Sequence, residues 1–466
     1  MTPDVVYGPL VAETAADVVV IGGGACGLVA ALAAADAGAE VIVLERDASP
    51  SGSTAMSSGF IPAPGTRFQR AAGVTGDGVE AFLEDIAAKT KGMGEARLAR
   101  LAAERIGPAL DWLATAHGLD WQVLTEFLYP GHSHHRMHTV PERTGAALMA
   151  RLLAAVEAAG IPVVTEAHAV RLHREGARMV GATVERPGGA RETLGCDALI
   201  LACNGYGGNP DLVRRHIPEI ADGAYYGHAG NTGDAVIWGD ALGAASHHLS
   251  GYQGHGSLAH PHGILITWAL MMEGAVQLNT EGRRFSNEHG GYSEQATAVL
   301  AQPGGVAWTL YDAERHRFAL SFPDYVQAVE AGAVREAADL PALATATGLP
   351  TVPLAETLAA AAAAHAGAAD AFGRDFRTKP PLTPPYFAVR VTGALFHTQG
   401  GLMIDGSARV LDGDGRPFAN LFAGGGAACG VSGPDVSGYL SGNGLLTAIA
   451  FGAIAGEAAG ALTAQA

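Results

Sequence analysis

Residues 18–27 read VVVIGGGACG, a β-branched run followed by a glycine-rich turn. The run Val18–Ile21 predicts a strand buried on both faces, and the turn fits the pattern G-x-G-x-x-G. An Ala- and Leu-rich segment, Leu28–Ala37, predicts a helix, and a second predicted strand, Glu40–Leu44, ends in Glu45. The stretch is therefore expected to open a strand–helix–strand unit that binds a dinucleotide.

Each position of the turn has a role in this interpretation. Gly22 permits the tight turn, Gly24 lets a pyrophosphate approach the backbone, and Gly27 lets helix and strand pack closely. Ala25, within the turn, is counted with them as a cofactor-binding position, and the helix N-terminus faces the phosphates with its partial positive charge. Glu45 would accept hydrogen bonds from a ribose.

The composition excludes several classes of protein. Of 466 residues, 64 are glycine, and 29 basic against 46 acidic residues give a net charge of −17. An acidic chain without a basic run is a poor partner for nucleic acid or an anionic membrane, so we expect neither. The uncharged stretches 18–35 and 439–456 are broken by glycines. We interpret them as a buried strand–turn–helix or turn–helix rather than as integral membrane segments.

Cysteine and histidine usage bears on the compartment and on metal binding. The four cysteines form no C-x-x-C pair, and the N-terminal residues lack a signal peptide pattern. So few cysteines are typical of a reducing compartment, so we expect a cytoplasmic protein. The histidine-rich stretch 131–138 (GHSHHRMH) has no carboxylate at fixed spacing beside it. We interpret it as a polar loop and expect no metal site.

The segment after the second predicted strand distinguishes FAD from NAD. Residues 46–66 read RDASPSGSTAMSSGFIPAPGT, and this stretch resembles the flavin-contacting segment of the fumarate reductase and 3-ketosteroid dehydrogenase family. The resemblance implies FAD. Covalently flavinylated members carry a histidine in this stretch and none is present here, so the FAD should be non-covalent. The positions implied to bind it are Arg46, Ser53, Thr54, Ser58 and Gly59.

Further pieces in the same order extend the resemblance over most of the chain. Residues 166–170 are placed like the family's adenine-flanking strand, and residues 203–209 resemble A-T-G-G-F-x-x-N. Residues 231–234 resemble T-G-D. Residues 420–426 resemble G-L-Y-A-A-G-E, with Gly426 in place of the glutamate, and residues 442–446 open the last helix. The implied cofactor positions are Ala169, Val170, Ala202, Asn204, Gly205, Asn209, Asp234, Gly425, Gly442, Asn443, Leu445 and Leu446.

These observations predict an α/β fold with a discontinuous, Rossmann-like FAD-binding domain. We expect this domain to comprise residues 1–234 and 382–466, and residues 235–381 to form an inserted α+β capping or substrate domain. In the resembled family this domain caps the reactive face of the flavin. The Pro-rich stretch 379–386 is a plausible return hinge.

Two motif positions argue against a dicarboxylate substrate. Fumarate reductases hold their substrate with arginines and histidines, and one arginine begins the motif R-L-G-G-N. The corresponding residues 439–443 read YLSGN, so Tyr439 takes the arginine's place. A second arginine follows the motif G-x-R-F-x-N-E, but residues 282–292 contain no T-R-D. Tyrosine cannot form a bidentate salt bridge with a carboxylate.

The same positions resemble ketosteroid dehydrogenases. Asn287–Tyr292 matches N-E-x-x-x-Y, whose tyrosine is the base, and Gly438–Gly442 matches G-Y-x-S-G. The resemblance implies that Tyr292 takes the α-proton while flavin N5 takes the β-hydride. Tyr439 is implied to grip the ketone oxygen, with Ser441 or a nearby backbone N–H as a second donor. Tyr129 loosely matches a third tyrosine of the family. Because a free tyrosine has a pKa of about 10, Tyr129 or His289 is expected to assist Tyr292.

We therefore expect an FAD-dependent dehydrogenase that forms a C=C bond α,β to the carbonyl of a cyclic ketone. The ketone is either a cyclohexanone, with or without a carboxylate, or a 3-ketosteroid. His397, in a stretch like H-H-T-M-G-G, either donates to a substrate oxygen or belongs to the flavin shell. Arg136, Arg143 and His397 could hold a substrate carboxylate. An external electron acceptor is implied: a quinone, a carrier protein or oxygen. The alternatives are a fumarate-reductase-type enzyme reducing an unsaturated carboxylate, and a flavin-binding module without activity.

Overall fold

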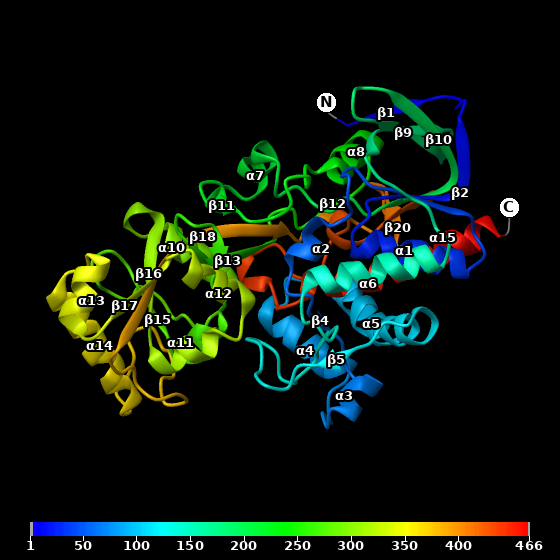
Figure 1. Cartoon of the computed structure of the whole chain (residues 1–466). Helices are drawn as coiled ribbons and strands as arrows, with labels where there is room; N and C mark the ends of the chain where they lie inside the picture. Colours follow the sequence, from blue (N-terminus) through cyan, green and yellow to red (C-terminus); the bar gives the residue numbers. More distant parts are fainter. Residues whose placement is uncertain (1–2, 465–466) are drawn as a thin grey trace. The chain divides into compact units, whose positions relative to one another are not determined.

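The computed structural model describes residues 3–464 and divides into two compact units (Figure 1). Unit 1 comprises Met1–His216, Gly227–Tyr252 and His397–Ala466, and unit 2 comprises Ile217–Tyr226 and Gln253–Phe396. Each unit combines a β-sheet with helices. The α/β fold class expected from the sequence is confirmed.

A parallel sheet forms the centre of unit 1. The β-branched Val18, Val19 and Val20 in its middle strand are fully buried, as a strand covered on both faces requires. Because the strands run parallel, their carboxyl ends meet at one edge. In order across the sheet, the strands are β7 (Val163–Val164), β3 (Val41–Leu44), β2 (Thr14–Ile21), β10 (Arg191–Leu201) and β21 (Pro417–Ala423).

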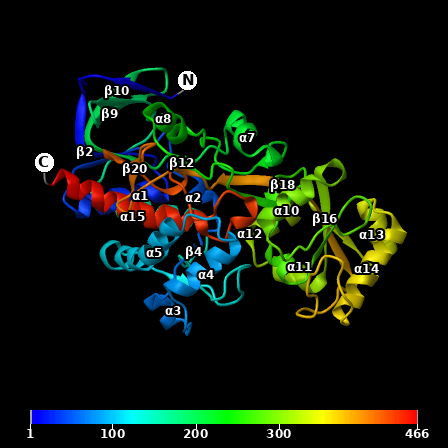
Figure 2. The same ribbon diagram turned by 180° about the vertical axis from the view of Figure 1, so that it is seen from behind.

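Helices α1 (Ala25–Asp36) and α15 (Asn443–Thr463) lie side by side in unit 1 (Figure 1, Figure 2). Small residues allow this close contact, because a Cβ on Gly456 would lie 2.1 Å from the Ala30 carbonyl oxygen. Among residues 3–464, α15 alone is long and apolar enough to cross a membrane, but 67% of its apolar window is buried in the structure. Burial of this kind is what a core helix shows.

Further strands, most of them paired antiparallel, extend the sheet, and smaller elements complete unit 1. Strands β1 (Asp4–Tyr7), β8 (His168–Glu175) and β9 (Arg178–Glu185) continue beyond β10, and β20 (Arg409–Leu411) pairs with β21. A three-stranded sheet contains β4 (Ile61–Pro62), β5 (Gln122–Val123) and β6 (Met137–Thr139), and β12 (Ser246–His247) pairs with β19 (Gly401–Leu402). The other helices are α2 (Gly52–Met56), α3 (Arg67–Ala71), α4 (Val79–Lys89), α5 (Ala96–His117), α6 (Gly145–Ala158), α7 (Pro210–His216) and α8 (Asp234–Leu242).

Unit 2 is built on a mixed sheet around its longest strand, β18 (Tyr386–Thr398). The sheet order is β14 (Ile264–Leu265), β13 (Tyr252–Ala259), β18, β16 (Val306–Asp312) and β15 (Val276–Leu278), with β11 (Ala224–Tyr225) and β17 (Val334–Ala337) also paired to β18. The helices of this unit are α9 (Ala269–Met272), α10 (Tyr292–Leu300), α11 (Ala313–Ala319), α12 (Pro323–Glu330), α13 (Leu340–Thr347) and α14 (Thr351–His365).

The bounds of unit 2 differ from the inserted segment 235–381 expected from the sequence. Helix α8 belongs to unit 1, because its Trp238 is fully buried in the hydrophobic core of that unit. At the other end, β18 pairs with β16 from Tyr386 to Thr392, so this strand belongs to the sheet of unit 2 rather than to the returning chain. Both differences arise from tertiary packing, which the composition of the segments does not reveal.

Candidate active site

The expected cofactor-binding segments follow four neighbouring parallel strands of unit 1. The glycine-rich turn follows β2, and the segments that begin at Glu45, Ala202 and Gly424 follow β3, β10 and β21. The segments after β2 and β3 are joined by a hydrogen bond, in which the Gly22 N–H donates to the Leu44 carbonyl at 2.8 Å. In open α/β sheets, the crevice at the carboxyl ends of the strands binds ligands.

The glycines of the turn are required for different reasons. Gly22 has a φ of 112°, and a Cβ there would lie 2.4 Å from the Ala202 carbonyl oxygen. A Cβ on Gly27 would lie 1.8 Å from the Gly22 carbonyl oxygen, so only glycine fits between helix and turn. At Gly24 a Cβ would meet only the Thr54 hydroxyl, at 3.6 Å. The protein itself therefore leaves room above Gly24, which is the room that a pyrophosphate approaching the backbone needs.

Glu45 and Arg46 extend the cradle after β3. The Glu45 carboxylate accepts hydrogen bonds from the Gly23 N–H and the Asp47 N–H, both at 2.9 Å, so it also holds the turn. Each carboxylate oxygen keeps a further lone pair for a ribose hydroxyl. The Arg46 guanidinium lies 3.7 Å from the Asp47 carboxylate and occupies the space in which a Gly230 side chain would stand.

Hydroxyl and amide side chains join three distant segments at this edge. The Thr54 hydroxyl accepts from the Ala25 N–H at 3.1 Å. The Ser53 hydroxyl accepts from the amides of Asn204 at 3.0 Å and Asn231 at 2.9 Å. The structure thus brings the segments after β2, β3 and β10 together around the turn, where the sequence places the cofactor.

Two further glycines pack against neighbours in the same region. A Cβ on Gly205 would lie 1.9 Å from the Thr398 hydroxyl oxygen. Gly425 has a φ of 57°, and a Cβ there would lie 3.1 Å from the Cys26 Cβ. Their absent side chains let the segments after β10 and β21 approach the turn closely.

Other expected cofactor residues hold the surrounding chain. Asn209 caps α7 by accepting from the Asp211 N–H at 3.1 Å, and its amide donates to the Thr232 carbonyl at 2.9 Å. Asp234 accepts from the Thr232 hydroxyl at 2.8 Å. These side chains are therefore committed to the loop, and a direct contact with the cofactor stays a prediction.

The remaining expected positions differ in exposure. Ser58 is exposed, whereas Gly59 is buried, and a Cβ on Gly59 would lie 2.8 Å from the Thr144 carbonyl oxygen. Ala169 and Val170 are buried in β8. For all of these residues a cofactor contact stays a prediction.

The start of α15 carries an unsatisfied acceptor. Gly442 precedes the helix with a φ of 87°, and Asn443 is fully buried. The Asn443 amide donates to the Ser432 hydroxyl at 2.9 Å, but its buried Oδ1 has no hydrogen-bond partner. A ligand N–H, such as that of a flavin pyrimidine ring, would satisfy it. Behind it, Leu446 is buried and Leu445 partly buried. With the room above Gly24, this orphan atom shows that the residues present fit FAD.

Two neutral side chains, His397 and Tyr129, lie near Tyr439 in unit 1. The His397 ring lies edge-on to the Tyr439 ring at 5.5 Å, and burial lowers the pKa of His397 to about 4. His397 Nδ1 lies 3.0 Å from the Gln399 amide nitrogen, which can only donate, and 3.4 Å from the Thr398 carbonyl oxygen; the shorter contact makes Nδ1 an acceptor and leaves the proton on Nε2. Burial raises the pKa of Tyr129, and the neighbouring Tyr439 adds to that shift. Ser441 is buried beside them.

The arginines suggested for a substrate carboxylate are engaged elsewhere. Arg136, whose side chain is wholly buried, pairs with Asp77 at 2.7 Å and also with Asp85. Arg143 pairs with Glu126 at 2.8 Å, and both side chains are about half exposed. The expectation that Arg136 holds substrate is therefore wrong, because two carboxylates already satisfy its guanidinium.

In unit 2, Tyr292 opens α10 within an aromatic cluster. Its ring stacks on His255 at 5.0 Å, and His255 also stacks on Phe396 at 5.1 Å. Trp268 lies edge-on to Tyr292 at 6.2 Å. Burial lowers the pKa of His255 to about 3, so this imidazole is neutral. The sequence interpretation missed His255, whose only signal is a lone histidine in a strand of small residues.

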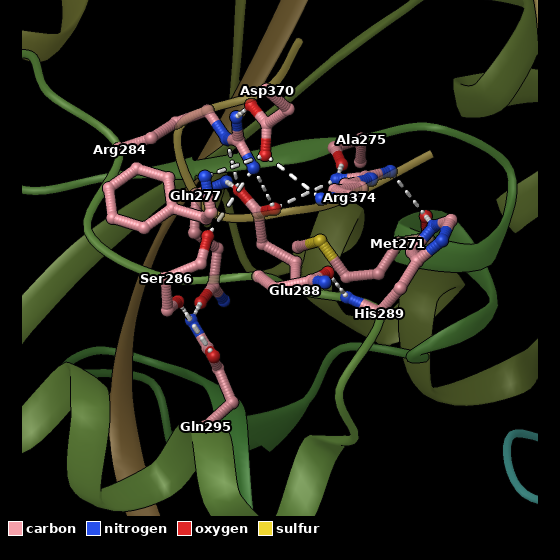
Figure 3. A network of polar contacts seen from close by, with 12 residues as sticks. Met271, Ala275, Gln277, Arg284, Ser286, Glu288, His289, Gln295, Asp370 and Arg374 are labelled. Atoms are coloured by element: carbon pink, nitrogen blue, oxygen red, sulfur yellow. Dashed lines mark hydrogen bonds and ion pairs between the residues drawn. The ribbon is translucent and has the colours of Figure 1, made fainter. Parts of the chain in front are cut away.

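A buried ion-pair network anchors the loop before Tyr292 (Figure 3). Glu288 is fully buried and accepts from Arg284 at 2.8 Å and from Arg374 at 3.0 Å. Burial alone would raise the pKa of Glu288, but Arg284 and Arg374 more than offset it, so the pKa lies below its usual range. The network fixes the chain just upstream of α10.

His289 does not fit the assisting role suggested for it. Its Nε2 lies 2.9 Å from the Met271 carbonyl oxygen, so Nε2 carries the proton (Figure 3). Burial lowers the pKa of His289. The neutral ring therefore has no proton on Nδ1 to donate to a developing phenolate. Within residues 3–464, no group of three or more His, Cys, Asp or Glu side chains could hold a metal ion.

Comparison with known proteins gives a consistent assignment. The family described as FAD binding domain matches residues 17–445. A probable fumarate reductase of Shewanella frigidimarina (strain NCIMB 400) is 30% identical over 94% of this chain and 74% of its own length. A 4-oxocyclohexanecarboxylate 2-dehydrogenase of Sinomonas cyclohexanicum is 26% identical over 95% and 93%. The open conformation of a flavocytochrome c3 fumarate reductase superposes with a TM-score of 0.82, at 29% identity over 97% of this chain and 79% of that one.

By their names, these similar proteins include fumarate reductases and a dehydrogenase of an oxocyclohexane carboxylate. The match covers the glycine-rich turn, both units and the start of α15. The expected cofactor, FAD, is confirmed. The chain belongs to this FAD-binding family and is an FAD-dependent oxidoreductase.

Proposed function

We propose that the chain dehydrogenates a cyclic ketone beside its carbonyl, forming a C=C bond α,β to it. The ketone loses its α-hydrogen as a proton and its β-hydrogen as a hydride, a two-electron oxidation. FAD, when bound, supplies the acceptor for the hydride. An external acceptor, which is a quinone, a carrier protein or oxygen, then takes the electrons.

One observation carries the proposal: two neighbours of Tyr439, Tyr129 and His397, are neutral hydrogen-bonding groups. Tyr129 and His397 are uncharged at neutral pH, and the buried Arg136 is already paired with two carboxylates. A dicarboxylate needs cations to replace its lost hydration. A ketone needs only hydrogen-bond donors that strengthen as charge develops on its oxygen.

The residues of the chain then have distinct roles. The Tyr439 hydroxyl donates to the ketone oxygen, and the Ser441 hydroxyl or a backbone N–H of residues 442–444 is the second donor. Tyr292 acts as its phenolate, having lost its own proton to solvent beforehand, and takes the α-proton to become a neutral phenol. His397, with its proton on Nε2, is a further donor on the Tyr439 side. The similarity to a 4-oxocyclohexanecarboxylate 2-dehydrogenase over nearly the whole of both chains supports a monocyclic ketone.

A fumarate-reductase-type activity is the second candidate. The 30% identity with a probable fumarate reductase and the TM-score of 0.82 with another favour it. It would require cations to bind the carboxylates, and Tyr439 stands where the resembled reductases carry an arginine.

Anaerobic mixing of the oxidised, FAD-loaded protein with ketones separates these functions. We expect cyclohexanone, 4-oxocyclohexanecarboxylate or a 3-ketosteroid to bleach the yellow flavin absorbance. If none does, and the pre-reduced protein instead reduces fumarate, the reductase assignment is correct. Bound FAD with neither reaction would indicate a binding module.

The base is tested in the same assay with Tyr292→Phe. We expect flavin reduction to slow by about 100-fold or more, since a lost general base costs on that order. Tyr7→Phe, at an exposed tyrosine of β1, is the matched control. Near-normal reduction of Tyr292→Phe would remove Tyr292 from the mechanism.

A further inference from the structure

The histidine-rich loop is anchored by a buried arginine. The Arg136 guanidinium donates to Asp77 at 2.7 and 3.1 Å and also pairs with Asp85, which lies in α4. The ring of Phe82, one turn earlier in α4, lies 4.6 Å from the guanidinium carbon. This clamp ties the loop to α4 and leaves Arg136 two further N–H groups for the loop itself, one on Nη2 that lies 3.4 Å from the Ser133 hydroxyl and one on Nη1.

The Nη1 donor determines the protonation of His132. Arg136 Nη1 lies 3.3 Å from His132 Nδ1, and a guanidinium can only donate, so Nδ1 accepts. The proton of the neutral ring is then on Nε2, which donates to the Ser441 carbonyl at 3.0 Å. Burial, and then the charge of Arg136, lower the pKa of His132 to about 4. The ring is therefore neutral across the physiological range.

The loop also packs directly on the segment that carries Tyr439. A Cβ on Gly131 would lie 2.8 Å from Leu440 Cδ1, and Leu440 is fully buried. Tyr129, in the same loop, lies close enough to Tyr439 to raise its own pKa further. The segment 439–442 forms neither helix nor strand. Its position therefore depends on contacts of this kind rather than on a ladder of backbone hydrogen bonds.

We propose that His132 and Arg136 are positioning residues that hold the Tyr439–Gly442 segment, and with it the donors for the substrate oxygen. Arg136 fixes the tautomer of His132, and His132 Nε2 fixes the Ser441 carbonyl. The substrate that this segment would contact rests on the proposed function. The hydrogen-bond chain from Arg136 through His132 to Ser441 does not depend on the proposed function. Neither residue touches the reacting atoms.

Paired variants test the role of His132. His132→Gln keeps a donor near the Nε2 position, whereas His132→Phe keeps the ring shape and removes the hydrogen bond. In FAD-loaded protein we expect His132→Phe to slow flavin reduction at saturating ketone on the order of 10- to 100-fold, with ketone affinity little changed. We expect His132→Gln to recover most of the rate. His262→Phe, at an exposed turn of unit 2, is the matched control. Equal rates for His132→Phe and wild type would overturn the proposal.

A second measurement does not depend on the reaction. In ¹⁵N NMR of the wild-type protein we expect His132 to show a protonated Nε2 and a bare Nδ1 from about pH 5 to about pH 9. Arg136→Gln, whose amide oxygen can accept a hydrogen bond, should increase the population of the other tautomer. A protonated Nδ1 in the wild type overturns the proposal even if His132→Phe fails to fold. If no ketone bleaches the wild type but this tautomer is found, the proposed function fails and the hydrogen-bond chain stands.

Discussion

A phenol and a guanidinium at position 439 would select different substrates. A guanidinium brings a permanent charge and two parallel donors that match a carboxylate. Tyr439 brings one neutral donor. The His397 ring lies edge-on to the Tyr439 ring, with the two ring centroids 5.5 Å apart. Because a ketone oxygen gains charge only as the α-proton leaves, a neutral donor acts mainly on the transition state. The residue at this position therefore bears directly on which reaction the flavin performs.

Removing the Tyr439 hydroxyl should expose this effect. We expect Tyr439→Phe to lower the limiting rate of ketone-dependent flavin reduction about 100-fold, as loss of one oxyanion donor does in other enzymes. Ketone affinity should change much less, since ground-state and transition-state binding are affected differently. Stopped-flow absorbance of the FAD-loaded protein measures both quantities. A proportional loss of affinity without a loss of rate would assign Tyr439 to simple binding.

At the scale of elements, sequence patterns predict what is local. The β-branched run, the glycine-rich turn and the acid after β3 predicted the strand–helix–strand unit. All of these signals lie within about 30 consecutive residues, so they can be recognised without knowing any distant contact. The partners of Glu288 could not be predicted in this way. Arg374 is 86 residues away in the chain, and the contact forms only when unit 2 folds. For the same reason the stacking of His255 on Tyr292 has no local signal.

The glycine-rich turn offers a matched pair of substitutions. Gly24 has an ordinary φ of −78°, and a Cβ there would meet only the Thr54 hydroxyl at 3.6 Å. Gly24→Ala should leave the melting temperature of the apoprotein nearly unchanged but weaken FAD binding by roughly tenfold, about 1.4 kcal/mol. Gly27→Ala should destabilise the apoprotein by about 1–3 kcal/mol, because its Cβ overlaps the Gly22 carbonyl. Thermal unfolding and FAD fluorescence titration distinguish them, and equal effects would contradict our interpretation of Gly24.

The Glu288 network predicts a specific loss of stability. Glu288→Gln leaves the buried Arg284 and Arg374 without their shared carboxylate, so we expect a loss of about 3–5 kcal/mol in the free energy of unfolding. The control is Glu356→Gln, whose partner Arg283 lies at 3.1 Å with both side chains more than half exposed, and which should cost less than about 1 kcal/mol. Urea unfolding at neutral pH measures both.

The acid dependence of stability tests the same carboxylate. Because the folded pKa of Glu288 is lowered, its contribution is present above the unfolded pKa and is lost as the pH falls through the folded pKa. The free energy of unfolding of the wild type should therefore fall to that of Glu288→Gln only below about pH 4. A difference between the two proteins that is the same at acid and neutral pH would show that the carboxylate charge is not what stabilises unit 2.

At the scale of the whole molecule, the chain supplies all expected FAD-binding residues from unit 1, and the two tyrosines of the proposed reaction from different units. Residues 46–66 contain no histidine to bond the flavin covalently. We therefore expect acid precipitation of the loaded protein to release intact FAD into the supernatant and to leave a chain of unmodified mass. Re-addition of FAD to the apoprotein should stabilise it by about 2.7 kcal/mol at 100 times its Kd, whereas NAD at the same concentration should not. Colour that stays with the precipitate, or a chain heavier by one flavin, would show a covalent link and place its attachment residue outside the segment that resembles the flavin-contacting one.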